Sequence, residues 1–260
     1  MKKVWKNIEV FFIFISLIIL VISSLFRFDN NDIMGIDKLI ADIIITIICY
    51  ILIIRLGIKE TAGFNKAGFK KGLMLGIPFI IIGIGSVIFS NIETEWTNIK
   101  HISIFNTIIF TINMLFVGIN EEIWMRGLVL NGLIKKYEKN SIWKPIIISS
   151  LIFGLVHIPN IFFVQPLILL IQVINAMCGG ILFATIFIKS KNIYSVMIIH
   201  ALTDWISLFI ASCFTGANSA LSMSINLGQA LFMIVGGSLP PILISIFLLR
   251  KAERINEENV

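Results

Sequence analysis

The sequence predicts an all-α integral membrane protein with eight transmembrane helices. Hydrophobic residues make up 57% of the 260-residue chain and charged residues only 14%, whereas soluble domains usually carry about 25% charged residues. Apolar runs close to the ~20 residues that a helix needs to cross a bilayer recur along the whole chain. No stretch between them is long and polar enough for a separate soluble domain, so residues 1–260 are interpreted as a single polytopic membrane domain.

The eight predicted spans follow these apolar runs in chain order, at 8–26, 38–56, 73–91, 103–134, 145–160, 164–188, 192–212 and 229–249. The first run could belong to a signal peptide, but it is long and no small-residue cleavage site follows it, which favours a retained helix. The fourth run is longer than a bilayer requires, so we expect its helix to tilt or to project on one side. The fifth run is short, and we expect Pro159 to mark its end.

The basic residues predict the orientation in the cell membrane. With eight spans both termini share one side, which would carry 17 of the 21 Lys and Arg residues, while the opposite side carries Arg27, Lys38 and Lys100, and Arg126 lies within a span. This is the positive-inside pattern with both termini in the cytoplasm. Because topology accounts for the net charge of +6, we expect lipid and no nucleic acid as a partner. The 17 residues are Lys2, Lys3, Lys6, Arg55, Lys59, Lys66, Lys70, Lys71, Lys135, Lys136, Lys139, Lys144, Lys189, Lys191, Arg250, Lys251 and Arg254.

A few polar side chains remain inside the predicted spans. An ionised side chain at mid-membrane costs about 2.5–3.5 kcal/mol, so such groups normally face the protein interior or a watery cavity and are candidates for function. Asp42 lies near the outer end of its span and is interpreted as interfacial. The full set is Asp42, Glu121, Glu122, Arg126, His157, His200 and Asp204.

Three predicted helices bring polar residues to a similar depth. At 1.5 Å per residue, Glu121 lies roughly 20 Å from the cytoplasmic end of its span, His157 roughly 18 Å and His200 roughly 12 Å. Convergence on one buried site accounts for this better than three unrelated energetic costs. The glycines of the stretches GIPFIIIGIG and CGG, which include Gly179 and Gly180, most simply mark close helix contacts.

The spacing of the charged residues predicts a division of roles within the fourth span. Glu122 and Arg126 are four residues apart and can form an ion pair on one helix face. Glu121 is rotated from Glu122 by about 100° and can point into a cavity. An ion pair that only fixes helix packing is the alternative, but the second carboxylate and the two histidines at matching depth favour a functional site.

Two further spans supply the rest of the predicted site. His200 and Asp204 are four residues apart, so Asp204 can face the same cavity or can orient the His200 ring. Phe153 lies one turn before His157 and can pack beside it. Peptide hydrolysis needs a base for water, a donor for the oxyanion and an acid for the leaving amine. A carboxylate and two imidazoles can supply all three.

Three motifs carry a family resemblance. EEIWMR (121–126) matches E-E-x-x-x-R, FGLVH (153–157) matches F-x-x-x-H, and HALTD (200–204) matches H-x-x-x-[ND]. In this order, on separate hydrophobic helices, they resemble the CAAX-protease and bacteriocin-processing family of intramembrane proteases, also called the abortive-infection family. It includes the type II prenyl-protein endopeptidases. The resemblance covers Glu121 to Asp204, within a motif core at 103–212, and the flanking spans match only in being hydrophobic.

The resemblance implies eight helices around a conical cavity that opens to the cytoplasm, and a membrane-associated peptide or protein as substrate. It implies that Glu121 and His157 activate water, and that His200 and Asp204 position the carbonyl and stabilise its oxyanion. Glu122, Arg126 and Phe153 would support the site. The third motif ends in Asp rather than Asn, and an ionised Asp cannot donate a hydrogen bond to an oxyanion. Asp204 would then be protonated, or would hold the His200 tautomer.

The sequence is compatible with more than one mechanism and more than one function. The resemblance favours a glutamate-type mechanism without a cofactor, but two His and a Glu are also legitimate zinc ligands, although they do not occur as H-E-x-x-H. A non-catalytic membrane protein that gives immunity to a bacteriocin is the alternative to a protease that cleaves CAAX-type or leader peptides. A proton-coupled transporter is disfavoured because the chain has no evident inverted repeat.

Overall fold

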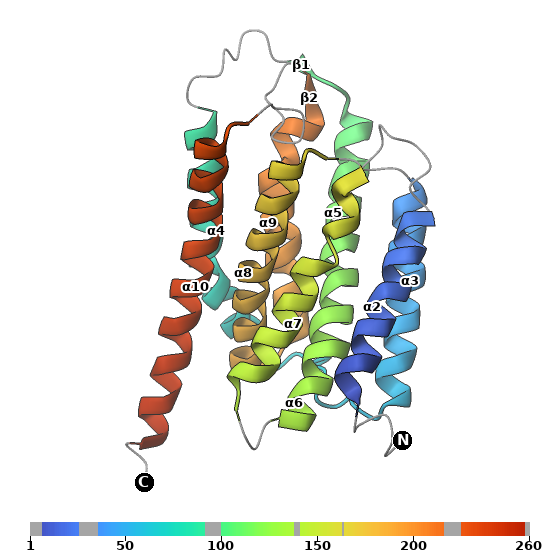
Figure 1. The fold of residues 1–260 in the computed structure, drawn as a ribbon, viewed down its shortest axis with the longest axis vertical. Coiled ribbons are helices and arrows are strands. Elements are labelled where there is room, and N and C mark those ends of the chain that lie inside the picture. The colour runs from blue at the N-terminus through green and yellow to red at the C-terminus, as the bar shows by residue number, and fades with distance from the viewer. Residues whose placement is uncertain are drawn as a thin grey trace.

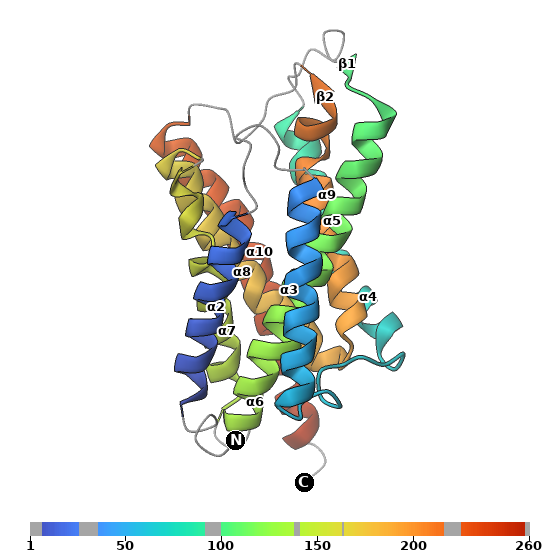
Figure 2. The same cartoon turned by 90° about the vertical axis from the view of Figure 1, so that its right-hand side faces the viewer.

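The computed structural model describes residues 7–25, 36–91, 100–137, 141–162, 164–215 and 225–257. Figures 1 and 2 show long helices that run side by side, with a short pair of strands at one end of the bundle. The elements are α2 Ile8–Leu25, α3 Ile36–Arg55, α4 Phe69–Ser90, β1 Lys100–His101, α5 Ile104–Glu122, the π-helix η2 Ile123–Leu130, α6 Asn131–Tyr137, α7 Trp143–Leu155, the 3-10 helix η3 Ile158–Phe162, α8 Pro166–Ser190, α9 Ile193–Cys213, β2 Phe214–Thr215 and α10 Leu227–Glu257.

An all-α membrane architecture is confirmed, with helices over each of the eight predicted spans. Within the described residues, six helical segments are long and apolar enough to cross a membrane by length and composition. The first two predicted spans, α2 and α3, are not among the six, so eight transmembrane helices stay a prediction. Helix α3 carries charged residues at both of its ends. The six segments are 69–89, 104–137, 143–162, 166–190, 193–213 and 227–250.

The outside of the bundle is apolar because lipid is its expected solvent. Large hydrophobic side chains are exposed along α3, α4 and α10, for example Ile47, Ile81 and Phe232. The buried core joins residues of α2, α3, η2, α7, α8 and α9. Exposed apolar area of this extent marks a membrane or protein interface rather than a water-facing surface.

The long fourth span changes helix type in its middle. Residues Ile123–Leu130 form a π-helix directly after α5 ends at Glu122, and all eight of its residues are buried. The π-helix is rare and often occurs at functional sites, because its wider turn changes which side chains share a face. The predicted run 103–134 is thus helical from Ile104 onward, but it is not a uniform α-helix.

The α-helix of the predicted fifth span ends earlier than expected, although the helical segment that could cross a membrane continues to Phe162. We expected Pro159 to end it, but α7 already ends at Leu155, and Pro159 lies inside the 3-10 helix η3. A proline disfavours the α conformation at the residue before it. The intervening turn keeps its backbone satisfied, because the His157 N–H donates to the Gly154 carbonyl at 3.1 Å and the Asn160 N–H to the His157 carbonyl at 3.0 Å. The break leaves His157 outside any regular helix.

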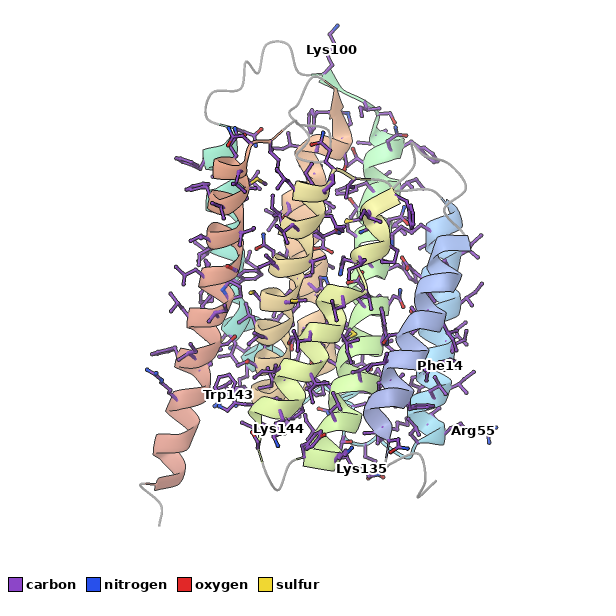
Figure 3. The ribbon with its side chains drawn as sticks, viewed as in Figure 1. Phe14, Arg55, Lys100, Lys135, Trp143 and Lys144 are labelled. Carbon is purple, nitrogen blue, oxygen red and sulfur yellow. The ribbon has the colours of Figure 1, made fainter. Side chains whose placement is uncertain are left out.

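The two ends of the bundle carry different basic residues. Helix α2 begins and α10 ends at the same end (Figure 1). Figure 3 places Arg55, Lys135 and Lys144 toward this end and Lys100 at the opposite end, as the predicted topology requires. Of the basic residues used to predict the orientation, Lys2, Lys3, Lys6, Arg27 and Lys139 lie outside the described residues. Which end faces the cytoplasm stays a prediction.

Candidate active site

The Glu122–Arg126 ion pair forms as the spacing predicts. Arg126 Nη1 donates to Glu122 Oε1 at 2.9 Å, and the two side chains are 3% and 0% exposed. Arg126 Nη2 donates to the carbonyl of Gly180 in α8 at 3.2 Å. The guanidinium carbon lies 4.9 Å from the ring centre of Phe153 and 5.3 Å from that of Phe183. Arg126 thus joins η2, α7 and α8 through a buried cation, which aromatic faces stabilise.

His200 is attached to the same carboxylate. Its Nδ1 atom lies 2.6 Å from Glu122 Oε1, and since an ionised carboxylate can only accept, Nδ1 is the donor. The His200 ring stacks on Phe183, with ring centres 4.8 Å apart, and meets the edge of Phe153 at 5.8 Å. The imidazole is therefore held on one nitrogen and packed against two aromatic rings, which fixes the direction of its Nε2 atom.

The other nitrogen of His200 faces two partly exposed carboxyl groups. Nε2 lies 3.4 Å from Asp204 Oδ2 and 3.6 Å from Glu121 Oε2. The Glu121 side chain is 24% exposed and the Asp204 side chain 33%, whereas Glu122 is fully buried. Since hydrogen bonds between nitrogen and oxygen are usually 2.7–3.2 Å long, both contacts are looser than the one to Glu122. The imidazole thus connects a buried structural carboxylate to two accessible ones.

His157 is linked to the cluster by Phe153, whose ring contacts both histidines. Its Nδ1 atom lies 2.8 Å from the backbone carbonyl of Phe153, which can only accept, so Nδ1 is the donor and Nε2 is left as the acceptor of the neutral ring. The Phe153 ring is perpendicular to the His157 ring at 5.4 Å and also contacts His200. Phe153 therefore lies between the two histidines, and its own backbone selects the tautomer of one of them.

Close packing of α5 on α9 brings the carboxylates to His200. A Cβ atom added to Gly118 would lie 2.7 Å from the backbone oxygen of Met197 and 2.9 Å from the Cβ of Ala201. Gly118 lies one turn before Glu122. The two helix backbones can approach this closely only because position 118 has no side chain, and this approach allows the 2.6 Å contact between Glu122 and His200.

The structure places Asp42 in the protein interior and corrects the expectation for several glycines. Asp42, interpreted as interfacial from the sequence, is 5% exposed, bound by Lys38 at 2.8 Å and by Asn120 of α5 at 2.9 Å, since a mid-helix carboxylate needs partners when buried; its depth in the membrane stays a prediction. Gly76 and Gly180 do mark close contacts, whereas Gly83, Gly85 and Gly179 have nothing within 4 Å of an added Cβ.

The structure therefore joins most of the predicted site residues directly. Glu121, Glu122, Arg126, His200 and Asp204 form one cluster of contacts, and His157 joins it through Phe153.

Sequence reasoning missed three other contributors, namely Gly118, the Gly180 carbonyl and Phe183. An apolar ring, a backbone carbonyl and a glycine give no polar signal inside an apolar helix. Within the described ranges, no group of three or more His, Cys, Asp or Glu residues has an arrangement that could hold a metal ion.

The comparison with protein families agrees with this geometry. Residues 103–206 match the family described as type II CAAX prenyl endopeptidase Rce1-like, which confirms the resemblance predicted from the three motifs. The matched residues include every member of the candidate site, from Glu121 to Asp204. No curated protein and no solved structure matches the chain. The six apolar helices within the described residues indicate a multi-pass membrane protein, and the match indicates its similarity to a family of proteases.

Proposed function

We propose that this chain is an intramembrane endopeptidase that cleaves a membrane-associated peptide or protein, of CAAX type or carrying a leader peptide. The arrangement of three carboxyl groups around His200 is the main support. One of them, Glu122, is buried and neutralised by Arg126, while Glu121 and Asp204 are partly exposed on the Nε2 side. A structural ion-pair network would need the buried pair but not the two accessible carboxyl groups.

In this proposal Glu121 is the general base. Its partly exposed carboxylate takes a proton from a water molecule, and the neutral tautomer of His157 can accept a hydrogen bond from that water through Nε2. The hydroxide attacks the substrate carbonyl, and the bond to the amine breaks as the protonated Glu121 returns its proton to the leaving nitrogen. One proton thus moves from water to amine, with the carboxylate restored at the end.

His200 then serves as the donor to the oxyanion. In its imidazolium form it can donate from Nε2 while Nδ1 remains bound to Glu122. A preorganised donor of this kind typically contributes a factor of about 10²–10³ to the rate. Asp204 Oδ2, at 3.4 Å from Nε2, orients this N–H. When the oxyanion forms, the N–H donates to the oxyanion instead of to Asp204. The buried Glu122–Arg126 pair keeps the ring from turning.

The decisive experiment compares the membrane proteome of cells that carry the wild-type chain with that of cells carrying Glu121→Gln. A precursor that accumulates only in the variant identifies the substrate and supports the protease. Equal proteomes with an intact cellular phenotype would reject proteolysis and favour the non-catalytic immunity role.

We also propose a mechanism without a metal cofactor, so cleavage by the purified protein should survive treatment with a zinc chelator. Loss of cleavage that is restored by added Zn²⁺ would establish a metalloprotease.

A further inference from the structure

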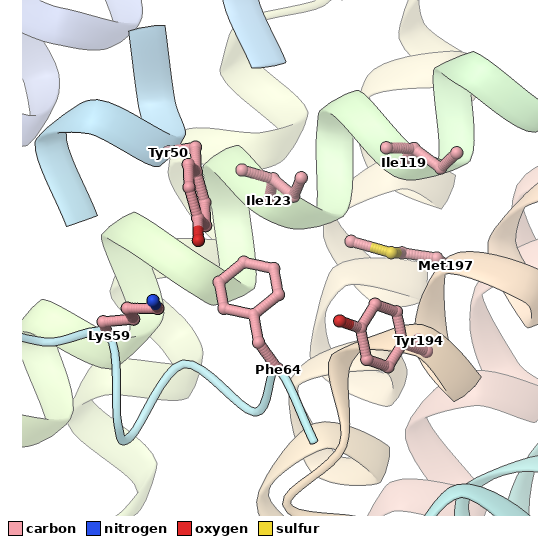
Figure 4. Close-up of a pocket in the computed structure, with 7 residues that line it drawn as sticks. All are labelled: Tyr50, Lys59, Phe64, Ile119, Ile123, Tyr194 and Met197. Carbon is pink, nitrogen blue, oxygen red and sulfur yellow. The ribbon is translucent and has the colours of Figure 1, made fainter. Parts of the chain in front are cut away.

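A second feature of the bundle is a cavity of about 550 Å³ beside the candidate active site (Figure 4). It lies between α3, α9 and the junction of α5 with η2. Ile119, Ile123 and Met197 supply its apolar side. Helices α3 and α9 each pack on α5 or η2, so the cavity occupies the furrow between them.

The other side of the cavity is polar and aromatic. Figure 4 shows the hydroxyl groups of Tyr50 and Tyr194 and the amine of Lys59 around the ring of Phe64, away from Ile119. Phe64 makes edge contacts with both tyrosines, at 5.5 Å and 6.2 Å between ring centres. Two phenol hydroxyls and an ammonium are hydrogen-bond donors. The cavity therefore offers donors and a positive charge at one side and hydrocarbon at the other.

The loop that carries Phe64 is firmly attached. The Ile193 N–H donates to the Gly63 carbonyl at 3.1 Å, and the Asn65 side chain donates to the Lys191 carbonyl at 3.4 Å. These bonds on either side of Phe64 join the loop to the turn between α8 and α9. The polar wall is thus a built part of the fold rather than a loose covering.

The apolar side continues onto an exposed apolar surface of α5. Ile108, Ile112 and Leu115 of α5 are 52%, 37% and 45% exposed, and their spacing of three or four residues continues to Ile119 and Ile123 on one helix face. From Leu115 to Ile123 the distance is about 12 Å at 1.5 Å per residue. That is close to half of the ~30 Å hydrocarbon core, the depth of one leaflet.

We propose that this cavity binds an anionic phospholipid of the leaflet at the basic end of the bundle. The phosphate accepts hydrogen bonds from Tyr50 and Lys59, which Figure 4 shows on the same side of the Phe64 ring, and one acyl chain follows the α5 stripe from Ile123 toward Leu115. The exposed stripe favours a lipid over a soluble anion, which would leave the apolar side unfilled. Lys59 favours an anionic headgroup over a zwitterionic one, because each Lys near an anionic lipid surface contributes about 1 kcal/mol, or about fivefold in affinity.

Native mass spectrometry of the detergent-solubilised full chain tests this proposal. The protein is titrated with phosphatidylglycerol and with phosphatidylcholine of the same acyl chains. We expect the wild type to prefer phosphatidylglycerol by about fivefold, Lys59→Gln to lose the preference, and Tyr50→Phe to weaken it. Lys66→Gln is the matched control, since Lys66 is an exposed lysine of the same loop outside the cavity lining, and it should bind like the wild type.

Three outcomes of the lipid titrations would overturn the proposal, and a fourth would come from a peptide. They are equal binding of the two lipids by the wild type, equal losses in Lys59→Gln and Lys66→Gln, and displacement of the lipid by glycerol phosphate alone, which would identify a free-anion site. If a peptide with a free C-terminal carboxylate binds at Lys59 while phosphatidylglycerol does not, the cavity belongs to the substrate and the lipid assignment is wrong. The measurement involves no proteolysis, so its result is independent of the proposed function.

Discussion

The Nδ1 atom of His200 lies 2.6 Å from Oε1 of Glu122, and the same oxygen accepts from Arg126 at 2.9 Å. This contact joins α9 to the last residue of α5 and leaves Nε2 of His200 directed at Glu121 and Asp204. The two neighbouring glutamates therefore have unequal environments. One is fully buried and bound on two sides, and the other is partly exposed, so substitutions at the two positions should have different effects.

Glu122→Gln should destabilise the protein as well as inactivate it. The amide leaves Arg126 without its charged partner in a buried position, and breaking such a pair typically costs about 3–5 kcal/mol. We expect lower membrane abundance, a lower apparent melting temperature in detergent and loss of turnover. A stable but inactive Glu122→Gln variant would show that Glu122 acts in the chemistry rather than in support of it.

Glu121→Gln should abolish cleavage and leave the fold intact. The amide has nearly the same shape but cannot take a proton from water near neutral pH, and its side chain is 24% exposed, so little buried interaction is lost. Turnover should fall by at least about 10²-fold, in the range that general-base catalysis contributes, with unchanged abundance and melting temperature. Turnover near the wild-type value would remove Glu121 from the role of base.

Gly118→Ala should separate α5 from α9. The new Cβ atom would lie 2.7 Å from the Met197 carbonyl oxygen, which is backbone and cannot turn away, and such overpacking typically costs about 1–3 kcal/mol. We expect reduced stability and reduced turnover, because the contact between Glu122 and His200 lengthens. Gly179→Ala in α8 is the matched control, since an added Cβ there meets nothing within 4 Å; equal losses in both variants would disprove the packing argument.

Asp204→Asn should retain turnover within about tenfold of the wild type, whereas Asp204→Leu should lose about 10²-fold. The amide can still accept from His200 and can itself donate to an oxyanion, but the leucine side chain can do neither. Steady-state cleavage by both variants at matched membrane levels measures this difference. Full activity of Asp204→Leu would show that the 3.4 Å contact with His200 has no part in the reaction.

The orientation can be tested by labelling single cysteines in a background without the native cysteines. Lys66→Cys, at the basic end, should react with an impermeant reagent only after the cells are opened, and Lys100→Cys should react from outside intact cells. Asn218, which precedes α10 in the sequence, is a second position predicted on the outer side, but it lies outside the described residues. Labelling of Lys66→Cys in intact cells would reverse the predicted topology.

The composition and spacing of the residues determined the helical architecture of this protein, one ion pair of its candidate site and its family resemblance. Apolar runs of membrane length predicted the helical architecture, and the described part of the chain contains six helical segments of suitable length and composition. The four-residue spacing of Glu122 and Arg126 predicted their ion pair, because neighbours on one helix are set by local geometry alone. The three motifs predicted the family that residues 103–206 match.

Only the tertiary structure decided how the helices meet. The burial of Asp42 against Asn120 and the approach of α5 to α9 at Gly118 both depend on residues from distant parts of the chain. No sequence pattern predicts that the ring of Phe183 stacks on His200. In an apolar helix every face is hydrophobic, so periodicity does not show which face meets protein and which meets lipid. That choice depends on close packing and on buried polar partners, which exist only once the helices have assembled.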